Sequence, residues 1–405
     1  MTATQPLAEL VHYVRGVTFK PEQKQDFGTP GSLVCMRTAN IQQTLDLSDV
    51  IAVPASVSRD DQKLRPGDIL ISSANSWNLV GKCVPVPKLP YDATAGGFIS
   101  IVRPNGQEVD PAYLYRWMSS GQTQHRIRQC ANKTTNISNL SVERFLALEA
   151  PVPPLAEQRR VAAMLDKADG IRRKRRESLK LLDDLLRSAF LEMFGRGPDA
   201  RNDWDHVTVR DLQAKVPHAC AGGPFGSSLT RSDYIDTPGV PVIRGTNLTL
   251  DGTFRDEGFV FVSETKAVEL RRNIARPGDI VFTQRGTLGQ VARIPDTANY
   301  RKYVVSQSQM KLTADDGLVD PTYLVHYFLS PGAAAHMASR QLATGVPHIN
   351  LGILLFFPVP LPPLALQRRF ASVAVAHTGT RDKLEKAQGD ADRLFDSLAQ
   401  RAFGG

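Results

Sequence analysis

The stretch "PPLAEQRR" at residues 153–160 returns as "PPLALQRR" at residues 362–369, and the copies differ only where Leu366 replaces Glu157. The similarity extends upstream, where "DPAYLYRWMSS" matches "DPTYLVHYFLS" and "RPGDI" occurs once in each half. Downstream, each copy runs without a gap to a Phe-Gly pair. Repeats at a fixed separation indicate a duplicated structural unit. The chain is therefore two copies of one module.

The size and composition of the chain are those of a folded protein with more than one domain. It has 405 residues, of which 42% are apolar and 22% charged, so it can bury substantial cores. The four cysteines are far apart and form no C-x-x-C pair, which indicates neither a disulfide framework nor a zinc site. The sequence begins without the features of a signal peptide, and its apolar runs are too short to cross a membrane. We therefore expect a cytoplasmic protein with no membrane partner.

The positive charge of the chain is distributed along it. The formal net charge is +8, and no segment is a polybasic tail, so a polyanionic partner would have to be held by shaped sites. The densest basic run is "IRRKRR" at residues 171–176. On a helix these cations point all around the axis, so the run is either a solvated surface or a contact with phosphate or a partner.

Each copy of the module has the same order of parts: a variable globular part, a proline hinge and one long helix. Short β-rich runs such as "DILISS" and "DIVFTQ" follow Pro-Gly turns. One helix is expected near Pro111–Met118 and its equivalent near Pro321–Leu329, because an Asp before Pro supplies an N-cap. The predicted fold class is α+β, with a mixed α/β domain in each copy. The predicted boundaries are globular domains at 1–152 and 196–361 and helical segments at 153–195 and 362–405.

The two helical segments carry a heptad pattern. In the first, apolar or small residues recur at heptad spacing from Val161 to Met193. Polar residues interrupt the seam at Arg172, Arg175, His377, Arg381 and Gln388. A helix of about forty residues is roughly 60 Å long and needs a partner, so we expect an antiparallel coiled coil with pseudo-twofold symmetry and a globular domain at each end. The alternative is a coiled-coil scaffold that holds two domains with no role in DNA binding.

The doubled "PPLAEQRR" and "PPLALQRR" segments, each following a domain with "RPGDI" and each closing in a long helix at Phe-Gly, resemble the specificity subunit of type I restriction-modification systems. The resemblance covers residues 10–404. It implies two target-recognition domains, each reading one half of a bipartite, non-palindromic sequence in double-stranded DNA. It also implies that the helices act as a spacer and as a dock for two methyltransferase subunits, which use S-adenosylmethionine to methylate adenine. The resemblance further implies restriction and translocation subunits as partners. It also implies that the protein acts in the cytoplasm of a prokaryote, in association with the nucleoid.

The hinge offers apolar and polar groups on which a methyltransferase subunit could dock. The residues singled out are Leu155, Gln158, Arg159, Arg160, Leu364, Gln367, Arg368 and Arg369. Leu366, which replaces Glu157, makes the two docks unequal.

The chain lacks motifs for chemistry of its own. A methyltransferase would show a glycine-rich cofactor loop and an Asp/Asn-Pro-Pro-aromatic turn, and neither is present. P-loop and H-E-x-x-H sequences are also absent. Glu264 and Lys266 have the spacing of a nuclease acid-x-lysine pair, but a solvated loop explains them better. We therefore expect a non-enzymatic subunit that binds neither a metal nor a cofactor.

Several loops contain residue types that read DNA. Arg pairs with guanine, Asn or Gln pairs with adenine, and Lys or Arg contacts phosphates. The candidates are Arg37, Asn40, Asn75, Lys82, Thr134, Asn136, Arg244, Asn247, Gln284, Arg285, Gln290, His348 and Asn350. The pairs Arg37/Asn40 and Arg244/Asn247 occur at equivalent positions, so they are either base contacts or turns that the fold requires. The sequence does not specify which bases are read.

Overall fold

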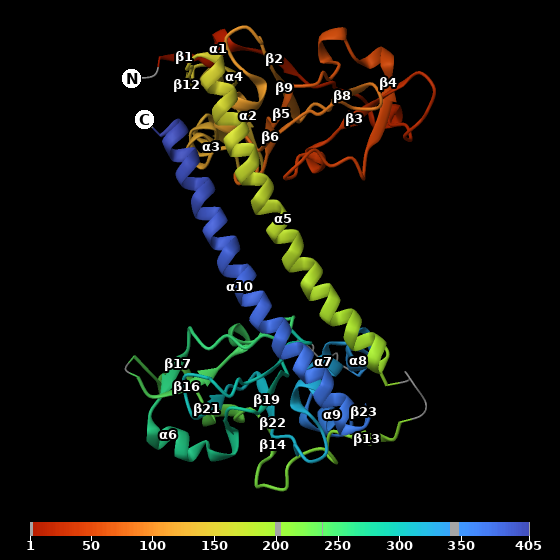
Figure 1. Ribbon diagram of the computed structural model, residues 1–405, viewed down its shortest axis with the longest axis vertical. Coiled ribbons are helices and arrows are strands. Elements are labelled where there is room, and N and C mark those ends of the chain that lie inside the picture. The colour runs from red at the N-terminus through yellow and green to blue at the C-terminus, as the bar shows by residue number, and fades with distance from the viewer. Residues whose placement is uncertain (1–2, 199–203, 237, 341–347, 405) are drawn as a thin grey trace. The chain divides into compact units, whose positions relative to one another are not determined.

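The computed structural model describes residues 3–198, 204–236, 238–340 and 348–404. The chain divides into two compact units. Unit 1 comprises Met1–Arg176 and Lys386–Gly405, and unit 2 comprises Glu177–Glu385. Each unit therefore contains one globular domain and a part of each of two long helices (Figure 1).

The globular domain of unit 1 is built on small, mostly antiparallel sheets. The largest has the strand order β2 (Val11–Arg15), β9 (Ile99–Pro104), β5 (Ile69–Ser72), β7 (Cys83–Pro85). A second has the order β4 (Ile51–Pro54), β3 (Ser32–Met36), β8 (Ala93–Ala95), and a third β10 (Ala131–Lys133), β11 (Ser138–Leu140), β6 (Ala74–Asn75). Strands β1 (Thr4–Pro6) and β12 (Glu149–Pro151) pair separately. The helices are α1 (Leu7–Leu10), α2 (Pro111–Ser119), α3 (Gly121–Gln129) and α4 (Val142–Leu146).

Unit 2 repeats this plan with local changes. One sheet has the order β14 (Cys220–Gly222), β22 (Gln309–Leu312), β19 (Ile280–Thr283), β20 (Val291–Arg293). The other has the order β15 (Tyr234–Ile235), β17 (Val260–Val262), β16 (Val240–Ile243), β21 (Tyr303–Val305), β18 (Ile274–Ala275). Strands β13 (His206–Thr208) and β23 (Pro358–Pro360) pair separately. The helices are α6 (Glu264–Glu269), α7 (Pro321–Leu329), α8 (Pro331–Ser339) and α9 (Leu351–Leu355). The predicted mixed α/β class is confirmed in both copies.

The helix expected in each globular part begins as the sequence indicates. The Asp110 carboxylate accepts hydrogen bonds from two backbone N–H groups in the first turn of α2, and Asp320 does the same for α7. Proline occupies the first helical position in both, where its missing N–H costs nothing. These helices bury their aromatic faces, and Tyr113 and Tyr323 donate hydrogen bonds to carbonyls of β12 and β23.

The repeated "RPGDI" sequence forms a turn that enters a buried strand. Gly67 and Gly278 have φ values of +90° and +94°, a conformation that a side chain disfavours. The carboxylates of Asp68 and Asp279 accept hydrogen bonds from backbone N–H groups three residues earlier. Both carboxylates are buried, and Asp68 is neutralised by a bidentate bond from Arg103 at 2.8 Å. The turn therefore recurs because its geometry depends on these residue types.

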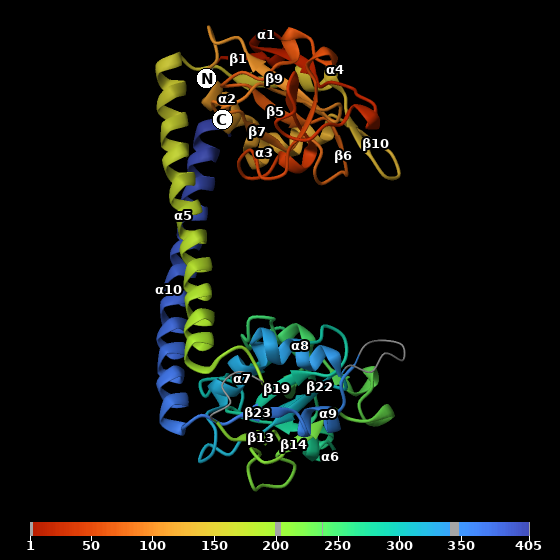
Figure 2. The ribbon, with the colours of Figure 1, turned by 90° about the vertical axis from the view of Figure 1, so that its right-hand side faces the viewer.

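The two long helices are α5 (Leu155–Phe194) and α10 (Leu364–Phe403). In unit 2, Asp183 lies 3.1 Å from His377, while Phe190, further along α5, packs on the earlier Phe370. In unit 1, Arg172 bonds to Asp392. Their segments therefore run antiparallel within each unit and lie side by side in both views (Figures 1 and 2).

Three of the polar residues that interrupt the heptad seam, Arg172, His377 and Arg381, make contacts between the helices. The Arg172 guanidinium donates to the Asp392 carboxylate at 2.7 Å in unit 1, and Arg381 lies 3.7 Å from Asp183 in unit 2. Both members of these pairs are related by the 209-residue repeat. Gln388 donates to Asp392 of its own helix at 2.9 Å. Positions 172 and 381 are therefore matched polar contacts between the helices, although the apolar pattern alone presented them as interruptions. Of the basic run, Arg172, Arg173 and Arg176 form ion pairs with carboxylates of the helices.

Candidate nucleic-acid interface

Unit 2 contains an open groove that brings together three of the predicted DNA-binding residues. All three line it: Arg244 follows β16, and Arg285 and Gln290 belong to the loop between β19 and β20. The groove, here called the reading groove, is also lined by Gly245, Thr246, Leu248, Thr249, Leu250, Arg255, Thr283, Gly286, Thr287, Ser308 and Gln309. Its lining combines guanidinium groups with hydroxyl and amide groups, which are the donors and acceptors that contact phosphates and base edges.

The two glutamines predicted to bind DNA in unit 2, Gln284 and Gln290, serve mainly to fix the loops of the reading groove. The Gln290 amide donates to the Leu248 carbonyl at 2.6 Å, and the Gln284 amide donates to the Gln307 carbonyl at 2.7 Å. The backbone N–H groups of Gln284 and Arg285 both point to the Ser308 carbonyl. The Arg285 side chain is exposed, so it is the predicted residue of this loop that is best placed to meet a ligand.

The sequence left two roles open for the repeated Arg/Asn pairs: base contacts, or turns that the fold requires. The asparagines have the second role. Asn40 is 2% exposed and Asn247 is 1% exposed. Each caps a 3-10 turn with its carbonyl oxygen and donates through its amide to two backbone carbonyls. Their prediction as base contacts is therefore wrong in this conformation, because no polar atom of either side chain is left for DNA.

The arginines of the same pairs use only part of their guanidinium groups in contacts with the protein. Arg37 forms an ion pair with Asp49 at 2.7 Å, and Arg244 donates to the Gly258 carbonyl at 3.0 Å. In both, the Nε atom is buried and has no hydrogen-bond partner among the described residues. Because a buried unsatisfied donor is costly, a water or a ligand oxygen is expected at these two equivalent positions.

In unit 1, four predicted residues lie on neighbouring loops. Asn75 belongs to β6, which pairs with β11, and Thr134 and Asn136 are exposed at the tip of the β10–β11 hairpin. This hairpin projects from the domain beside β6 (Figure 2). The Lys82 ammonium group donates to Gln42 at 3.1 Å. Two neighbours in the same loops, Lys133 and Trp77, were not named individually among the candidates, and their ammonium group and ring centroid are 5.6 Å apart.

The last two DNA-binding candidates, His348 and Asn350, lie in the segment of unit 2 that is equivalent to the β10–β11 hairpin of unit 1. Arg285 and His348 form an antiparallel bridge, at positions equivalent to Ala74 and Asn139 in unit 1. The Asn350 side chain accepts from the Ile353 N–H at 2.9 Å and so caps α9. Residues 345–347 of the predicted "GVPHIN" stretch lie outside the described residues.

Two further residues of unit 2 were missed by sequence reasoning. Arg255 is exposed on the wall of the reading groove, and Phe225 is 93% exposed. The Phe225 loop is held by Gln307, which donates to the carbonyls of Gly226 and Leu229. Both residues sit in turns whose position depends on tertiary contacts, so local sequence carried little signal for them.

The two hinge glutamines have a different role from the one predicted. Gln158 and Gln367 are fully buried. Each accepts a hydrogen bond from the N–H of the Asp that caps α2 or α7, at 2.8 Å, and donates to a hinge proline carbonyl. Their prediction as partner contacts is therefore wrong, because they join each long helix to its own domain.

The other hinge residues lie nearer the surface. Arg159 and Arg160 are 69% and 68% exposed at their side chains, Arg368 and Arg369 are exposed, and Leu155 and Leu364 are half-buried. Arg160 donates to Glu157, which lowers the pKa of Glu157. In the second copy Leu366 replaces this carboxylate and packs against the core of unit 2, so Arg369 has no such partner three residues before it.

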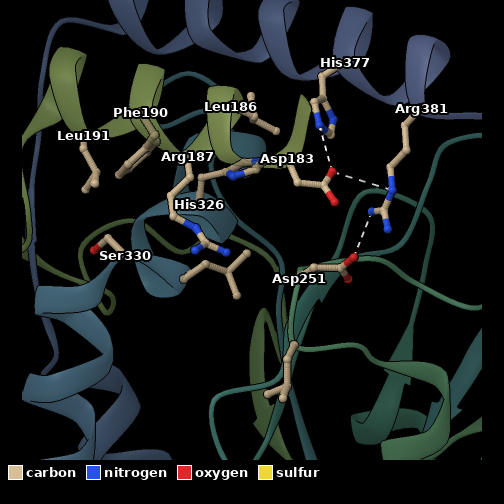
Figure 3. A pocket seen from close by; sticks show the side chains of 12 residues that line it. Asp183, Leu186, Arg187, Phe190, Leu191, Asp251, His326, Ser330, His377 and Arg381 are labelled. Carbon is tan, nitrogen blue, oxygen red and sulfur yellow. Dashed lines mark hydrogen bonds and ion pairs between the residues drawn. The ribbon is translucent and has the colours of Figure 1, made fainter. Parts of the chain in front are cut away.

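A polar cluster in unit 2 joins the helices to the domain (Figure 3). Asp183 of α5 lies beside His377 and Arg381 of α10, and Arg381 donates to Asp251 of a domain turn at 2.8 Å. Burial alone would raise the pKa of Asp251, but hydrogen bonds from Thr249 and Arg381 lower it to about 2. Burial lowers the pKa of the nearby His326 to about 4, with His377 adding to the effect.

We find no cluster of metal-ligating side chains in the described parts of the chain. Among the same residues, no helix is long and apolar enough to cross a membrane. Burial raises the pKa of the Cys35 thiol to about 11 and those of Cys83 and Cys220 to about 12, so these thiols are protonated and poorly nucleophilic at neutral pH.

The chain thus consists of a duplicated α+β module with a long helix after each copy. The chain belongs to the type I restriction modification DNA specificity domain family, whose model matches residues 5–181 and 222–388. It is a non-catalytic DNA sequence-recognition subunit of a type I restriction-modification system, and it works within a complex with other subunits of that system. The alternative of a scaffold without DNA binding is not favoured.

Individual relatives agree with this assignment. The chain is 24% identical to the type I restriction enzyme EcoKI specificity subunit of Escherichia coli (strain K12) over 418 residues, covering 99% of this chain and 88% of that protein. It is 32% identical over 166 residues to the StySPI specificity subunit of Salmonella potsdam, covering 40% and 35% of the two chains. The crystal structure of a type I S subunit from M. genitalium has the same fold, with a TM-score of 0.58, 15% identity, and coverage of 99% and 96%.

Proposed function

We propose that unit 1 and unit 2 each read one half of a bipartite, non-palindromic target in double-stranded DNA. The observation that carries this proposal is the reading groove of unit 2, which gathers Arg244, Arg255 and Arg285 with hydroxyl and amide groups. Within the described residues, the guanidinium groups of Arg255 and Arg285 form no ion pair, so both are free to meet phosphates or guanine edges.

Unit 1 meets its half-site with the loops around the β10–β11 hairpin. Asn75, Thr134 and Asn136 supply hydrogen-bonding groups, and Lys82 and Lys133 supply positive charge. The two sets differ in residue type, as expected of two domains that read different bases. In unit 2, Gln284, Gln290 and His348 hold the loops that carry Arg244 and Arg285, and Asn350 caps α9. Arg37 is the unit 1 equivalent of Arg244.

Two methyltransferase subunits dock on the hinges and long helices, one for each copy of the module. The exposed hinge residues Leu155, Arg159, Arg160, Leu364, Arg368 and Arg369 are the proposed contacts. S-adenosylmethionine is bound by those subunits, which methylate adenine, and restriction and translocation subunits complete the system. The complex acts in the cytoplasm of a prokaryote, at the nucleoid.

Co-expression with a candidate adenine methyltransferase tests this function. Native mass spectrometry should find two methyltransferase chains for each copy of this chain. Replacing Arg255 and Arg285 together by Gln should weaken DNA binding by the complex and flatten its salt dependence, because two phosphate or base contacts are lost. Arg301→Gln, outside the groove lining, is the matched control. A chain that fails to co-purify, or a groove variant that binds like the control, would refute the proposal.

A further inference from the structure

The turn at residues 249–253 in unit 2 is closed by its own polar groups. One carboxylate oxygen of Asp251 accepts hydrogen bonds from the Thr249 hydroxyl and from the Thr253 N–H. Gly252 has φ +89°, and a Cβ atom there would lie 2.7 Å from the Leu329 side chain of α7. The turn therefore has one compact shape and is packed directly against the domain.

The second carboxylate oxygen of Asp251 points to α10. It accepts a hydrogen bond from Arg381 at 2.8 Å, and Arg381 also lies 3.7 Å from Asp183 of α5 (Figure 3). Arg381 lies 3.1 Å from Glu385 of its own helix. The Arg381 side chain is 27% exposed, so solvent screens these contacts less than it screens a fully exposed pair. One guanidinium group thus joins both helices to the turn.

The same turn forms one wall of the reading groove. Leu248, Thr249, Leu250 and Arg255 all line that groove. The Arg255 N–H donates to the Asn247 carbonyl at 2.8 Å, and the Leu248 carbonyl accepts from Gln290. Leu250 also lines the pocket around Arg381. A shift of the turn would therefore move the side of the groove that carries Arg255.

Unit 1 lacks this connection. Its equivalent turn lies between the bridged residues Ile41 and Leu45, is two residues shorter than the one between Leu248 and Phe254, and contains no carboxylate. Arg172, the equivalent of Arg381, instead bonds to Asp392 and lies 4.3 Å from the Phe395 ring centroid. Unit 1 therefore provides an internal comparison.

We propose that Arg381 and Asp251 are positioning residues for base discrimination in the half-site read by unit 2. Their ion pair holds the turn at residues 249–253 in register with the helices and so fixes the groove wall that bears Arg255. Neither residue contacts DNA. This inference rests on the proposed function of the groove, and it predicts that discrimination in the unit 1 half-site is independent of Arg381.

The test uses the full chain in its methyltransferase complex and a library in which every base of each half-site is substituted singly. Arg285→Gln first identifies the half-site of unit 2. Asp251→Asn keeps the oxygen that closes the turn and removes the charge, and Arg381→Met removes the guanidinium. Each should lower discrimination in the unit 2 half-site by about two- to tenfold, with the other half-site unchanged. The double variant should discriminate like either single variant, because both substitutions break the same contact between the turn and α10.

Two controls separate positioning from a general loss of structure. Asp392→Asn removes the carboxylate that bonds to Arg172, the unit 1 equivalent of Arg381, and should leave the unit 2 half-site read normally. Arg381→Lys keeps the charge and should retain part of the discrimination. Unchanged discrimination in the Asp251 and Arg381 variants, or an equal loss in both half-sites, would overturn this inference alone. A wild-type complex that prefers no bipartite target would instead overturn the proposed function.

Discussion

Gln158 and Gln367 are the residues that attach each long helix to its own domain. Their side chains are fully buried and bridge the capping Asp of the domain helix to the proline hinge. The hinge motif therefore recurs because its glutamine completes the same buried network twice. The neighbouring arginines, at the surface, are the part of the motif that is open to partners.

Replacing either glutamine by Ala should destabilise its unit. Gln158→Ala and Gln367→Ala each leave a part-buried Asp N–H without its acceptor, which costs about 1–3 kcal/mol of unfolding free energy. Chemical denaturation measures the change. Arg160→Ala, at an exposed position of the same hinge, should change stability by less than about 0.5 kcal/mol. Equal effects of Gln158→Ala and Arg160→Ala would contradict the buried role.

His326 should make unit 2 sensitive to mild acid. Burial, with a smaller contribution from His377, lowers its folded pKa to about 4, whereas an unfolded histidine titrates at about 6.5. Its contribution to stability is therefore present above pH 6.5 and is lost as the pH falls toward 4, by at most about 1.4 kcal/mol per pH unit.

Denaturation curves between pH 7.5 and pH 5 test this, with His326→Phe as the comparison, because its packing on Phe370 can be kept by a ring. The variant should lose part of the pH dependence of the unfolding free energy. Identical pH dependence in the two proteins would show that His326 is not the group responsible.

The elements that the sequence predicted well are those specified by local signals. Helices α2 and α7 begin where Asp and Pro stand together, because a cap and a first-turn proline act within one helical turn. The hinge prolines likewise precede α5 and α10. The local sequence did not show that Arg172 and Asp392 face each other. A heptad pattern does not specify which residue of one helix lies opposite a given residue of the other.

The candidate site was predictable only in part for the same reason. Arg244 was found because it follows a recognisable strand, and Arg285 and Gln290 because their loop is polar and contains glycine; the structure brings all three to one groove. For Asn40, the sequence left a base contact and a turn required by the fold both open, because it does not specify side-chain direction. In the structure its amide donates to the carbonyls of Asp46 and Asp49. Arg255 was missed because tertiary packing positions its turn.

The contact between the helices in unit 1 should depend on the charges at residues 172 and 392. Arg172→Asp places a third carboxylate beside Asp169 and Asp392 and should lower stability by about 1–3 kcal/mol. Adding Asp392→Arg should recover part of the loss. Lys167→Asp, at an exposed position of α5, is the control in the same thermal denaturation series. A double variant no more stable than Arg172→Asp would show that the pair does not contribute as described.

The duplication gives one chain two modules of the same plan, so a single module should be able to pair with a second copy of itself. Residues of α10 that pack in unit 1 have counterparts in α5 at a separation of 209 residues: Phe395 matches Leu186, and Phe403 matches Phe194. Asp392 matches Asp183. A chain of residues 1–195 thus carries both halves of the contact.

Residues 1–195 should therefore form a symmetric dimer in which Arg172 pairs with Asp183 of the second copy. Light scattering should give twice the chain mass. Arg172→Asp should weaken the dimer, and Arg172→Asp with Asp183→Arg should restore it. The dimer should also bind an inverted repeat of the first half-site. An inert monomer would contradict the antiparallel pairing of equivalent helix segments.

Mapping methylated adenines in cells that express this chain with its methyltransferase tests the central claim most directly. Two different reading units on one chain predict a single motif made of two unlike, fixed half-sites separated by unspecified bases. Arg285→Gln should change one half-site and leave the other as it was. A continuous or palindromic motif, or a change in both half-sites at once, would contradict the assignment of one half-site to each unit.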